Sequence, residues 1–288
     1  MPRLSYNANG LRNLTVEVAV EEVAEAGYDG IELSLHPAHI DPFTFTESDA
    51  SVIRKALDRT GIEACCLAAG ADNLLGEERF EPSLIHPDAA GRARRIDLVR
   101  RSVRIADTLG IHLINFATGK RKPEVDPEQA RRWLVEGITE ILDTTDSDVV
   151  LCMEPEPEFF LETNAAVAGL AHELSSPRFA LAQDLGHCRV VEEDYLTSVE
   201  HHLPLTPVIQ VEDIKGRTHH HEIPGDGDID FVEFFRILRR GGYEGHVSVE
   251  LYNHIEVYRH ALRRSHEVLT AAAEAAASSA SSASVDGN

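Results

Sequence analysis

Hydrophobic residues gather in eight short runs along the chain, and a longer stretch with helical spacing follows each of them. The apolar runs lie near residues 4–6, 30–35, 62–68, 111–116, 148–154, 179–184, 208–212 and 246–251. Apolar residues recur at helical spacing near residues 15–27, 49–60, 88–109, 126–145, 164–175, 194–202, 230–240 and 256–275. Short continuous runs are typical of buried strands, and the longer stretches are typical of amphipathic helices. The pattern therefore predicts regular alternation of strand and helix.

Glycine marks the passage from a helical stretch to the next strand at four points. These glycines are Gly27, Gly61, Gly110 and Gly242. Each follows a helical pattern and directly precedes an apolar run. Glycine is favoured there because a helix commonly ends in a left-handed residue, a conformation that a side chain disfavours. The same helix-turn-strand unit thus recurs along the chain, which favours a repeated architecture.

Strict alternation of strand and helix indicates parallel strands joined by right-handed crossovers. Eight such units favour an α/β protein with a closed (β/α)8 TIM barrel, and an open doubly wound sheet is the alternative. We expect one barrel domain over residues 1–270. Residues 271–288 are rich in alanine and serine without an apolar face, so they are predicted to form a disordered tail.

The chain has 288 residues, with 27 Lys and Arg against 49 Asp and Glu, so its formal net charge is −22. This balance excludes a general nucleic-acid binder, because contacts to the phosphate backbone need a basic face. No run of about 18 apolar residues and no apolar signal core is present, so we expect no membrane partner and a cytoplasmic location. The four cysteines form no CxxC pair, and we interpret them as reduced core residues.

Acidic residues end the last four predicted strands. Glu154 ends the fifth strand, Asp184 the sixth, Glu212 and Asp213 the seventh, and Glu250 the eighth. In a (β/α)8 barrel these strand ends converge on one mouth, where active sites lie. Carboxylates gathered there repel one another unless cations are present. The pattern therefore predicts a divalent-metal site.

Histidines follow two of these strands. His187 lies in a turn three residues after Asp184, and the loop after the seventh strand carries His219, His220 and His221. Residues two apart in an extended loop point to the same side, so His219 and His221 are candidate ligands and His220 is expected to face water. Imidazole and carboxylate together suit Mn, Fe, Co or Zn.

Other polar residues have structural interpretations. Glu156 and Glu158 are expected to be charges on the barrel rim. Glu32 lies within an apolar strand and is expected to be buried with a polar partner. Asp228 or Asp230 is predicted to cap the helix that begins near residue 230, because aspartate accepts hydrogen bonds from the first free amides of a helix.

An ordered set of motifs resembles a known family. The motifs are GYDGIEL, MEPEP, QDLGH, PGDGDIDF and GGYEGHVSVEL. Together they resemble the xylose isomerase-like barrel superfamily of sugar-phosphate isomerases and epimerases, over roughly residues 4–262. The resemblance implies that a divalent ion (Mn, Co, Zn, Fe or Mg) is held at Glu154, Asp184, Glu212 and Glu250. It also implies that Glu154 and Glu250 act as acid and base, and that His187 contacts substrate oxygens.

The seventh strand departs from the family pattern. The epimerases usually have a histidine ligand there, whereas this sequence offers Glu212 or Asp213. Four carboxylates around one dication leave a net negative charge, which favours a second cation. In the apurinic endonuclease branch of the superfamily, the positions matching His187, His219 and His221 hold a further zinc. The histidines that this branch uses after strands two to four are missing here, so one or two ions per chain are expected.

The resemblance implies a metal-dependent isomerase or epimerase of a sugar, polyol or related hydroxycarbonyl compound, working through an enediolate. The connection Gly70–Pro87 is expected to form a lid that carries substrate selectivity. The alternatives are a dehydrating lyase, a two-metal phosphoester hydrolase, and a catalytically silent barrel that binds a partner in a pathway complex. The expected partners are a small-molecule substrate and, by resemblance, further copies of the chain.

Overall fold

All eight predicted strands are present, and they pair in chain order into a closed parallel barrel. The computed structural model describes residues 2–70, 74–76 and 78–282. The strands are β1 (Arg3–Asn7), β2 (Gly30–Ser34), β3 (Glu63–Ala68), β4 (Leu113–Ala117), β5 (Val150–Glu154), β6 (Phe179–Asp184), β7 (Val208–Val211) and β8 (His246–Val249). Pairing of β1 with β8 closes the barrel. The predicted TIM barrel is confirmed, and the open sheet is excluded.

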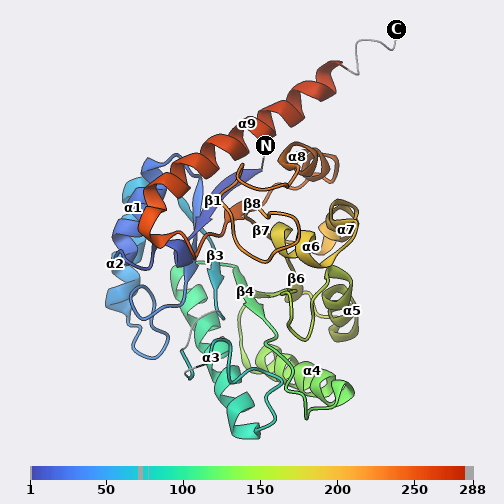
Figure 1. The fold of residues 1–288 in the computed structure, drawn as a ribbon. Coiled ribbons are helices and arrows are strands. Elements are labelled where there is room, and N and C mark those ends of the chain that lie inside the picture. The colour runs from blue at the N-terminus through green and yellow to red at the C-terminus, as the bar shows by residue number, and fades with distance from the viewer. Residues whose placement is uncertain (1, 71–73, 77, 283–288) are drawn as a thin grey trace.

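Helices surround the barrel on its outside (Figure 1). They are α1 (Val16–Glu25), α2 (Glu47–Thr60), α3 (Ala89–Leu109), α4 (Pro127–Thr144), α5 (Asn164–Leu174), α6 (Leu185–Val191), α7 (Tyr195–His202), α8 (Phe231–Arg240) and α9 (Tyr258–Ser282). Helix α6 replaces the turn that we expected after the sixth strand. Within the described ranges, no helix is long and apolar enough to cross a membrane.

Glycine ends the helical segments as predicted. Gly27, Gly61, Gly110 and Gly242 have φ angles of +96°, +76°, +73° and +67°. These angles lie in the left-handed region, which any residue with a side chain enters at a cost. The helix-turn-strand repeat that the sequence shows is therefore a real backbone unit. It sets the point at which four of the strands begin.

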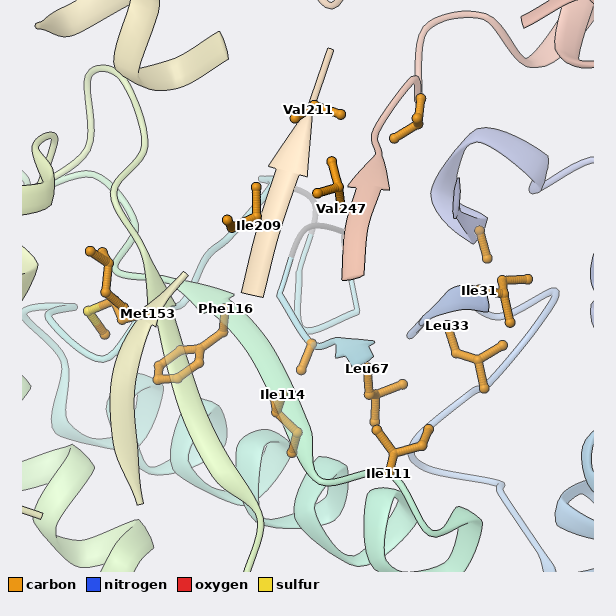
Figure 2. Packing of buried hydrophobic residues seen from close by; sticks show 14 of the residues in the cluster. Ile31, Leu33, Leu67, Ile111, Ile114, Phe116, Met153, Ile209, Val211 and Val247 are labelled. Atoms are coloured by element: carbon orange, nitrogen blue, oxygen red, sulfur yellow. The ribbon is translucent and has the colours of Figure 1, made fainter. Parts of the chain in front are cut away.

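Side chains of each strand alternate between two environments. One set packs outward in a hydrophobic cluster shared with the helices, and Figure 2 shows Ile31 and Leu33 of β2, Ile114 and Phe116 of β4, and Ile209 and Val211 of β7. The residues between them, Glu32, Asn115 and Gln210, face the barrel axis and hydrogen-bond to one another across it. This two-residue period decides which side chains reach the barrel mouth.

Small residues fill the half of the barrel interior that lies towards the N-terminal ends of the strands. Cys66, Cys152, Ala180, Ala182 and Val208 form a cluster of their own there. A cavity of about 360 Å³ opens below them, towards the N-terminal ends of the strands. All four cysteines are free, and three are fully buried, which agrees with the core role predicted for them. Burial raises the pKa of the Cys65 thiol to about 12, so it is protonated at neutral pH.

The end of the chain differs from the prediction. Helix α9 continues to Ser282, so the predicted tail boundary at residue 271 falls inside it. Ala272, Ala273 and Ala276 are buried and belong to the main hydrophobic cluster. These alanines give α9 a narrow buried face, and we mistook their small side chains for the lack of an apolar face. Residues 283–288 of the predicted tail lie outside the described residues.

Candidate functional site

Four strands deliver carboxylates to the same end of the barrel. Glu154 and Asp184 are the last residues of β5 and β6, and Glu212 and Glu250 directly follow β7 and β8. Each stands two residues after an inward-facing position, so the two-residue period of a strand turns it inward as well. All four are buried. Oxygens of Glu154, Asp184 and Glu250 lie within 4.8 Å of one another.

Asp213, the other candidate after β7, has a structural role. Its carboxylate accepts hydrogen bonds from the backbone amides of Ile214, Gly225 and Ile229 at 2.9, 2.8 and 3.0 Å. These three bonds fold the loop between β7 and α8 back onto its own base. Asp213 has the outward register of its strand, so the structure leaves Glu212 facing the site. At the end of the loop, Asp230 caps α8 through Glu233 N at 2.9 Å, as one of the two predicted caps.

Asp184 and His187 are held together by the start of α6. Asp184 is the N-cap of this helix, and its Oδ1 accepts from His187 N at 2.8 Å. The first turn carries His187 over the barrel mouth, where its Nδ1 lies 3.0 Å from Glu154 Oε1. Gly186 lies between them and packs against the Glu212 carboxylate so closely that a Cβ atom would overlap Glu212 Oε1.

The loop after β7 brings two histidines to the same place. Ring atoms of His187, His219 and His221 lie within 4.8 Å of one another. His221 Nδ1 is 2.9 Å from the backbone oxygen of Glu250 and donates to it, which leaves Nε2 as a free acceptor on the other side of the ring. His220 is exposed, as predicted, and contacts Asn253.

Buried polar atoms without a hydrogen-bond partner are concentrated in this group. They are Asp184 Oδ2, both carboxylate oxygens of Glu212, and Nε2 of His187, His219 and His221. Buried polar groups in folded proteins are nearly always paired, because leaving one unpaired costs free energy. These atoms form two overlapping groups, since ligand atoms of Asp184, His187 and Glu212 lie within 4.8 Å of one another and so do those of His187, His219 and His221. A divalent cation would satisfy the atoms of one such group, and a mixture of carboxylate and imidazole suits Mn, Fe, Co or Zn. The residues present therefore fit a metal ion.

The electrostatics of the group are those of a site that needs positive charge. Burial and the Asp184 carboxylate raise the pKa of Glu212 well above its usual value. Burial lowers the pKa of His219 to about 4 and that of His221 to about 3, so both rings are neutral, the form that binds metals. Burial alone would lower the pKa of His187, but Asp184 and Glu156 outweigh it and raise that pKa well above its usual value.

Asparagine side chains hydrogen-bond to one carboxylate oxygen of Glu154 and to one of Glu250. Asn115 Nδ2 donates to Glu154 Oε2 at 2.9 Å. Asn9 and Asn7 donate to Glu250 Oε1 at 2.6 and 3.3 Å. The remaining oxygens lie near imidazoles, Glu154 Oε1 beside His187 and Glu250 Oε2 at 3.6 Å from His221 Nδ1. Each carboxylate is thus fixed on one side and free to react on the other.

Glu32 lies below these groups on β2. It is fully buried and accepts from Gln210 Nε2 at 3.2 and 3.3 Å, so the predicted buried residue with a polar partner is confirmed. Burial raises its pKa to about 7. Among the described residues, its polar neighbours are uncharged apart from the other carboxylates of the barrel.

A cavity of about 70 Å³ leads from the carboxylates to solvent. Arg79 and Phe80, from the connection predicted to be a lid, line it together with Tyr252. The Arg79 guanidinium lies 5.4 Å from the ring centroids of both Phe80 and Tyr252. Residues 71–73 and 77 of the connection lie outside the described residues, and a lid movement stays a prediction.

Glu156 and Glu158, both predicted to be charges on the barrel rim, lie in different environments. Glu158 is exposed and pairs with Lys120 at 2.6 Å, as expected for a rim charge. For Glu156 the expectation was wrong, because its side chain lines the cavity and its Oε2 lies 3.7 Å from His187 Nδ1. Burial raises the pKa of Glu156 to about 7.

Sequence reasoning missed the amides that organise the site. Asn115 and Gln210 are single polar residues inside apolar runs, at inward positions of β4 and β7, and this signal was visible in the sequence. Asn7 and Asn9 come at the end of β1, where an asparagine gives no comparable signal. Nothing in the sequence distinguishes Arg79 from the other arginines of the chain.

Known proteins share this sequence pattern and this fold. The family model described as xylose isomerase-like TIM barrel matches residues 20–272. L-ribulose-5-phosphate 3-epimerase of Escherichia coli is 23% identical over 232 residues, which cover 79% of this chain and 78% of that one. A D-tagatose 3-epimerase-like protein superimposes with a TM-score of 0.82 at 16% identity, covering 96% and 99% of the two chains. D-psicose 3-epimerase, crystallised in the presence of D-fructose, superimposes with a TM-score of 0.74 at 22% sequence identity. That match covers 93% of this chain and 99% of the epimerase.

Proposed function

Because the chain belongs to the xylose isomerase-like TIM barrel family, we propose that it is a divalent-metal-dependent epimerase or isomerase of a sugar or related hydroxycarbonyl compound. Its relatives by sequence and by fold are named as sugar epimerases, and those described above act at carbon 3 of a ketose. We therefore propose epimerisation of a ketose at carbon 3 as the first reaction to test.

One observation supports this function most directly. Glu154 and Glu250 come from separate strands, line the same cavity, and each keeps one carboxylate oxygen free of the amides that hold the other. Epimerisation needs such a pair, since a proton leaves one face of a carbon next to a carbonyl and another proton reaches the opposite face. One carboxylate takes the proton, the C–H electron pair enters the enediolate, and the other carboxylate returns a proton.

The remaining residues prepare the substrate for this transfer. Glu154, Asp184, Glu212 and Glu250 would hold the ion, which when bound supplies positive charge that stabilises the enediolate oxygens. His187 is positioned to contact a substrate oxygen, because its ring lines the cavity beside Glu154. Arg79, Phe80 and Tyr252 line the same cavity, where they can contact a bound substrate.

The test is an assay of the full chain loaded with Mn²⁺. D-psicose, D-tagatose, D-fructose, L-ribulose and L-ribulose 5-phosphate are each incubated with it in D₂O, and the products are separated and analysed by NMR. We expect a carbon-3 epimer that carries deuterium at carbon 3. A dehydrated product would instead indicate the lyase alternative, and release of inorganic phosphate would indicate the hydrolase. No exchange with any ketose would overturn the proposal.

The histidine cluster keeps a second candidate open, the two-metal phosphoester hydrolase. His187, His219 and His221 are close enough to share an ion, and within the described part of the chain the Nε2 atoms of all three rings have no hydrogen-bond partner. Two ions held side by side are a common arrangement for phosphoester hydrolysis. The two candidates differ in metal stoichiometry, which can be measured without knowing the substrate.

Metal content per chain separates them, measured by elemental mass spectrometry on untagged protein. We expect one tightly held ion, lost in Glu212→Gln and kept in His219→Ala, because neither oxygen of the buried Glu212 carboxylate has a hydrogen-bond partner among the described residues. His220→Ala is the matched control, since that ring is exposed. Two ions per chain, one of them lost in His219→Ala, would favour the hydrolase. No metal at all would favour a catalytically silent barrel.

A further inference from the structure

A chain of hydrogen bonds crosses the barrel interior beneath the proposed metal group. Gln210 Nε2 of β7 donates to the Glu32 carboxylate of β2 at 3.2 and 3.3 Å. Gln210 Oε1 accepts from Asn115 Nδ2 of β4 at 2.8 Å, and the same Asn115 nitrogen donates to Glu154 Oε2 at 2.9 Å. We call Glu32, Gln210, Asn115 and Glu154 the amide chain. It links three strands to a fourth that carries the reacting carboxylate.

The direction of every donor in the amide chain is fixed by its two ends. A carboxylate accepts hydrogen bonds and donates none when ionised, so each end requires an amide NH₂ group to face it. Gln210 must therefore turn its nitrogen to Glu32 and its oxygen to Asn115. That oxygen in turn accepts from the Asn115 nitrogen, whose second hydrogen points at Glu154. If Gln210 were reversed, Asn115 would have to present its oxygen, which would repel the Glu154 carboxylate.

Stability does not explain a carboxylate at the far end of this chain. Glu32 is 0% exposed, and its hydrogen-bond partner is a neutral amide. With a pKa of about 7, Glu32 is ionised in part of the molecules at neutral pH, and an ionised group held by neutral partners lowers the stability of the fold. An amide or apolar residue of similar size would lower it less. A residue that lowers stability at such a site is expected where it improves the geometry of a functional group.

We propose that Glu32 is a positioning residue, which acts through the Gln210 and Asn115 amides to hold the Glu154 carboxylate in the orientation that binds metal and transfers the proton. The proposal rests on the function proposed above for Glu154. Held in this way, Glu154 Oε2 is occupied by Asn115, and Oε1 is presented to the cavity beside His187. When a residue that orients a metal ligand without binding the metal itself is replaced, metal affinity or activity typically falls by about 10- to 100-fold.

The test exchanges the acid and the amide within the chain. Glu32→Gln removes one of the two fixed ends, so that only the Glu154 end still opposes reversal of Gln210 and the chain is held less firmly. Gln210→Glu alone places two carboxylates side by side at the centre of the barrel. The double variant Glu32→Gln/Gln210→Glu keeps the charge and the number of atoms, and it restores one direction, because the carboxylate at position 210 accepts from both position 32 and Asn115. Each protein is measured for Mn²⁺ binding by calorimetry, for kcat and KM, and for melting temperature.

We expect Glu32→Gln to raise the Kd for Mn²⁺ about 10-fold and to lower kcat by a similar factor, with KM little changed. Its melting temperature should not fall, since a buried charge has been removed. The double variant should recover both quantities to within about threefold of the wild type, a result that a purely structural role of Glu32 would not give. Wild-type Kd and kcat in Glu32→Gln, or a double variant no better than the single ones, would overturn the proposal.

Failure of the proposed function can be recognised separately. If the wild-type protein epimerises no ketose, the reaction assigned to Glu154 is wrong, but the Mn²⁺ Kd still reports whether Glu32 orients that carboxylate. Gln129→Glu is a matched control for the change in residue type, because Gln129 lies on the outside of the barrel in α4. It should leave the Mn²⁺ Kd as in the wild type.

Discussion

Replacing either Glu154 or Glu250 with glutamine is expected to lower kcat for ketose epimerisation by about 10³-fold, within the range found when a general acid or base is removed. The change keeps the size of the side chain and its hydrogen bond to Asn115 or to Asn9, but glutamine cannot take up a proton. Each variant is assayed at saturating Mn²⁺, so that weaker metal binding does not limit the rate. The measurement is interconversion of the two epimers together with deuterium incorporation at carbon 3.

The two variants should also differ from each other in a way that shows which face of substrate carbon 3 each carboxylate serves. With one carboxylate left, exchange can continue only for the epimer whose C–H bond points at it. Glu154→Gln and Glu250→Gln should therefore retain residual exchange with opposite epimers. Glu158→Gln is the matched control, since that glutamate is exposed and pairs with Lys120 outside the cavity. Unchanged interconversion in either active-site variant would remove that residue from the reaction.

Gly186→Ala should weaken the metal site although no proposed ligand is itself replaced. The added methyl group would overlap Glu212 Oε1, and the Glu212 side chain, which is fully buried, would have to move. We expect the carboxylate to be displaced and the Kd for Mn²⁺ to rise by about 100-fold. At a Mn²⁺ concentration 100 times the wild-type Kd, bound metal stabilises the wild type by about 2.7 kcal/mol, and the variant by only about 0.4 kcal/mol.

Thermal unfolding with and without Mn²⁺ measures this difference directly. Gly169→Ala provides the control, because Gly169 lies in α5 and nothing lies within 4 Å of an added Cβ. That change should raise stability by up to about 1 kcal/mol through helix propensity, and it should leave the gain from Mn²⁺ intact. A Gly186→Ala protein that binds Mn²⁺ as tightly as the wild type would show that Glu212 is not a ligand.

The fold was predictable because its signals are local and repeated. Eight apolar runs and four helix-ending glycines each report on one unit, and the barrel follows from their number and order. Helix α6 was not predicted, because its seven residues, Leu185–Val191, are too few to show a helical period. The C-terminal end of α9 was mispredicted for another reason, because the spacing of alanines alone does not distinguish a buried helix face from an exposed one.

The site was predictable where strand register decides it. A strict two-residue alternation places Glu212 with the inward Gln210 and places Asp213 with the outward Val211, so the ambiguity after β7 could have been resolved from the sequence. Glu156 could not be placed in this way, because it follows β5 in a loop with no period. Loop residues reach a site through tertiary contacts, which a single sequence does not encode in any regular pattern.

The three backbone hydrogen bonds of Asp213 have a thermodynamic consequence for whatever binds at the barrel mouth. They order the loop that carries His219 and His221 when the chain folds, so the loss of backbone entropy belongs to folding and not to binding. A ligand of these histidines then meets a rigid surface, and its association need not include the entropic penalty of ordering a loop. Variation in the outer part of the loop can therefore change what is bound without changing how firmly the histidines are presented.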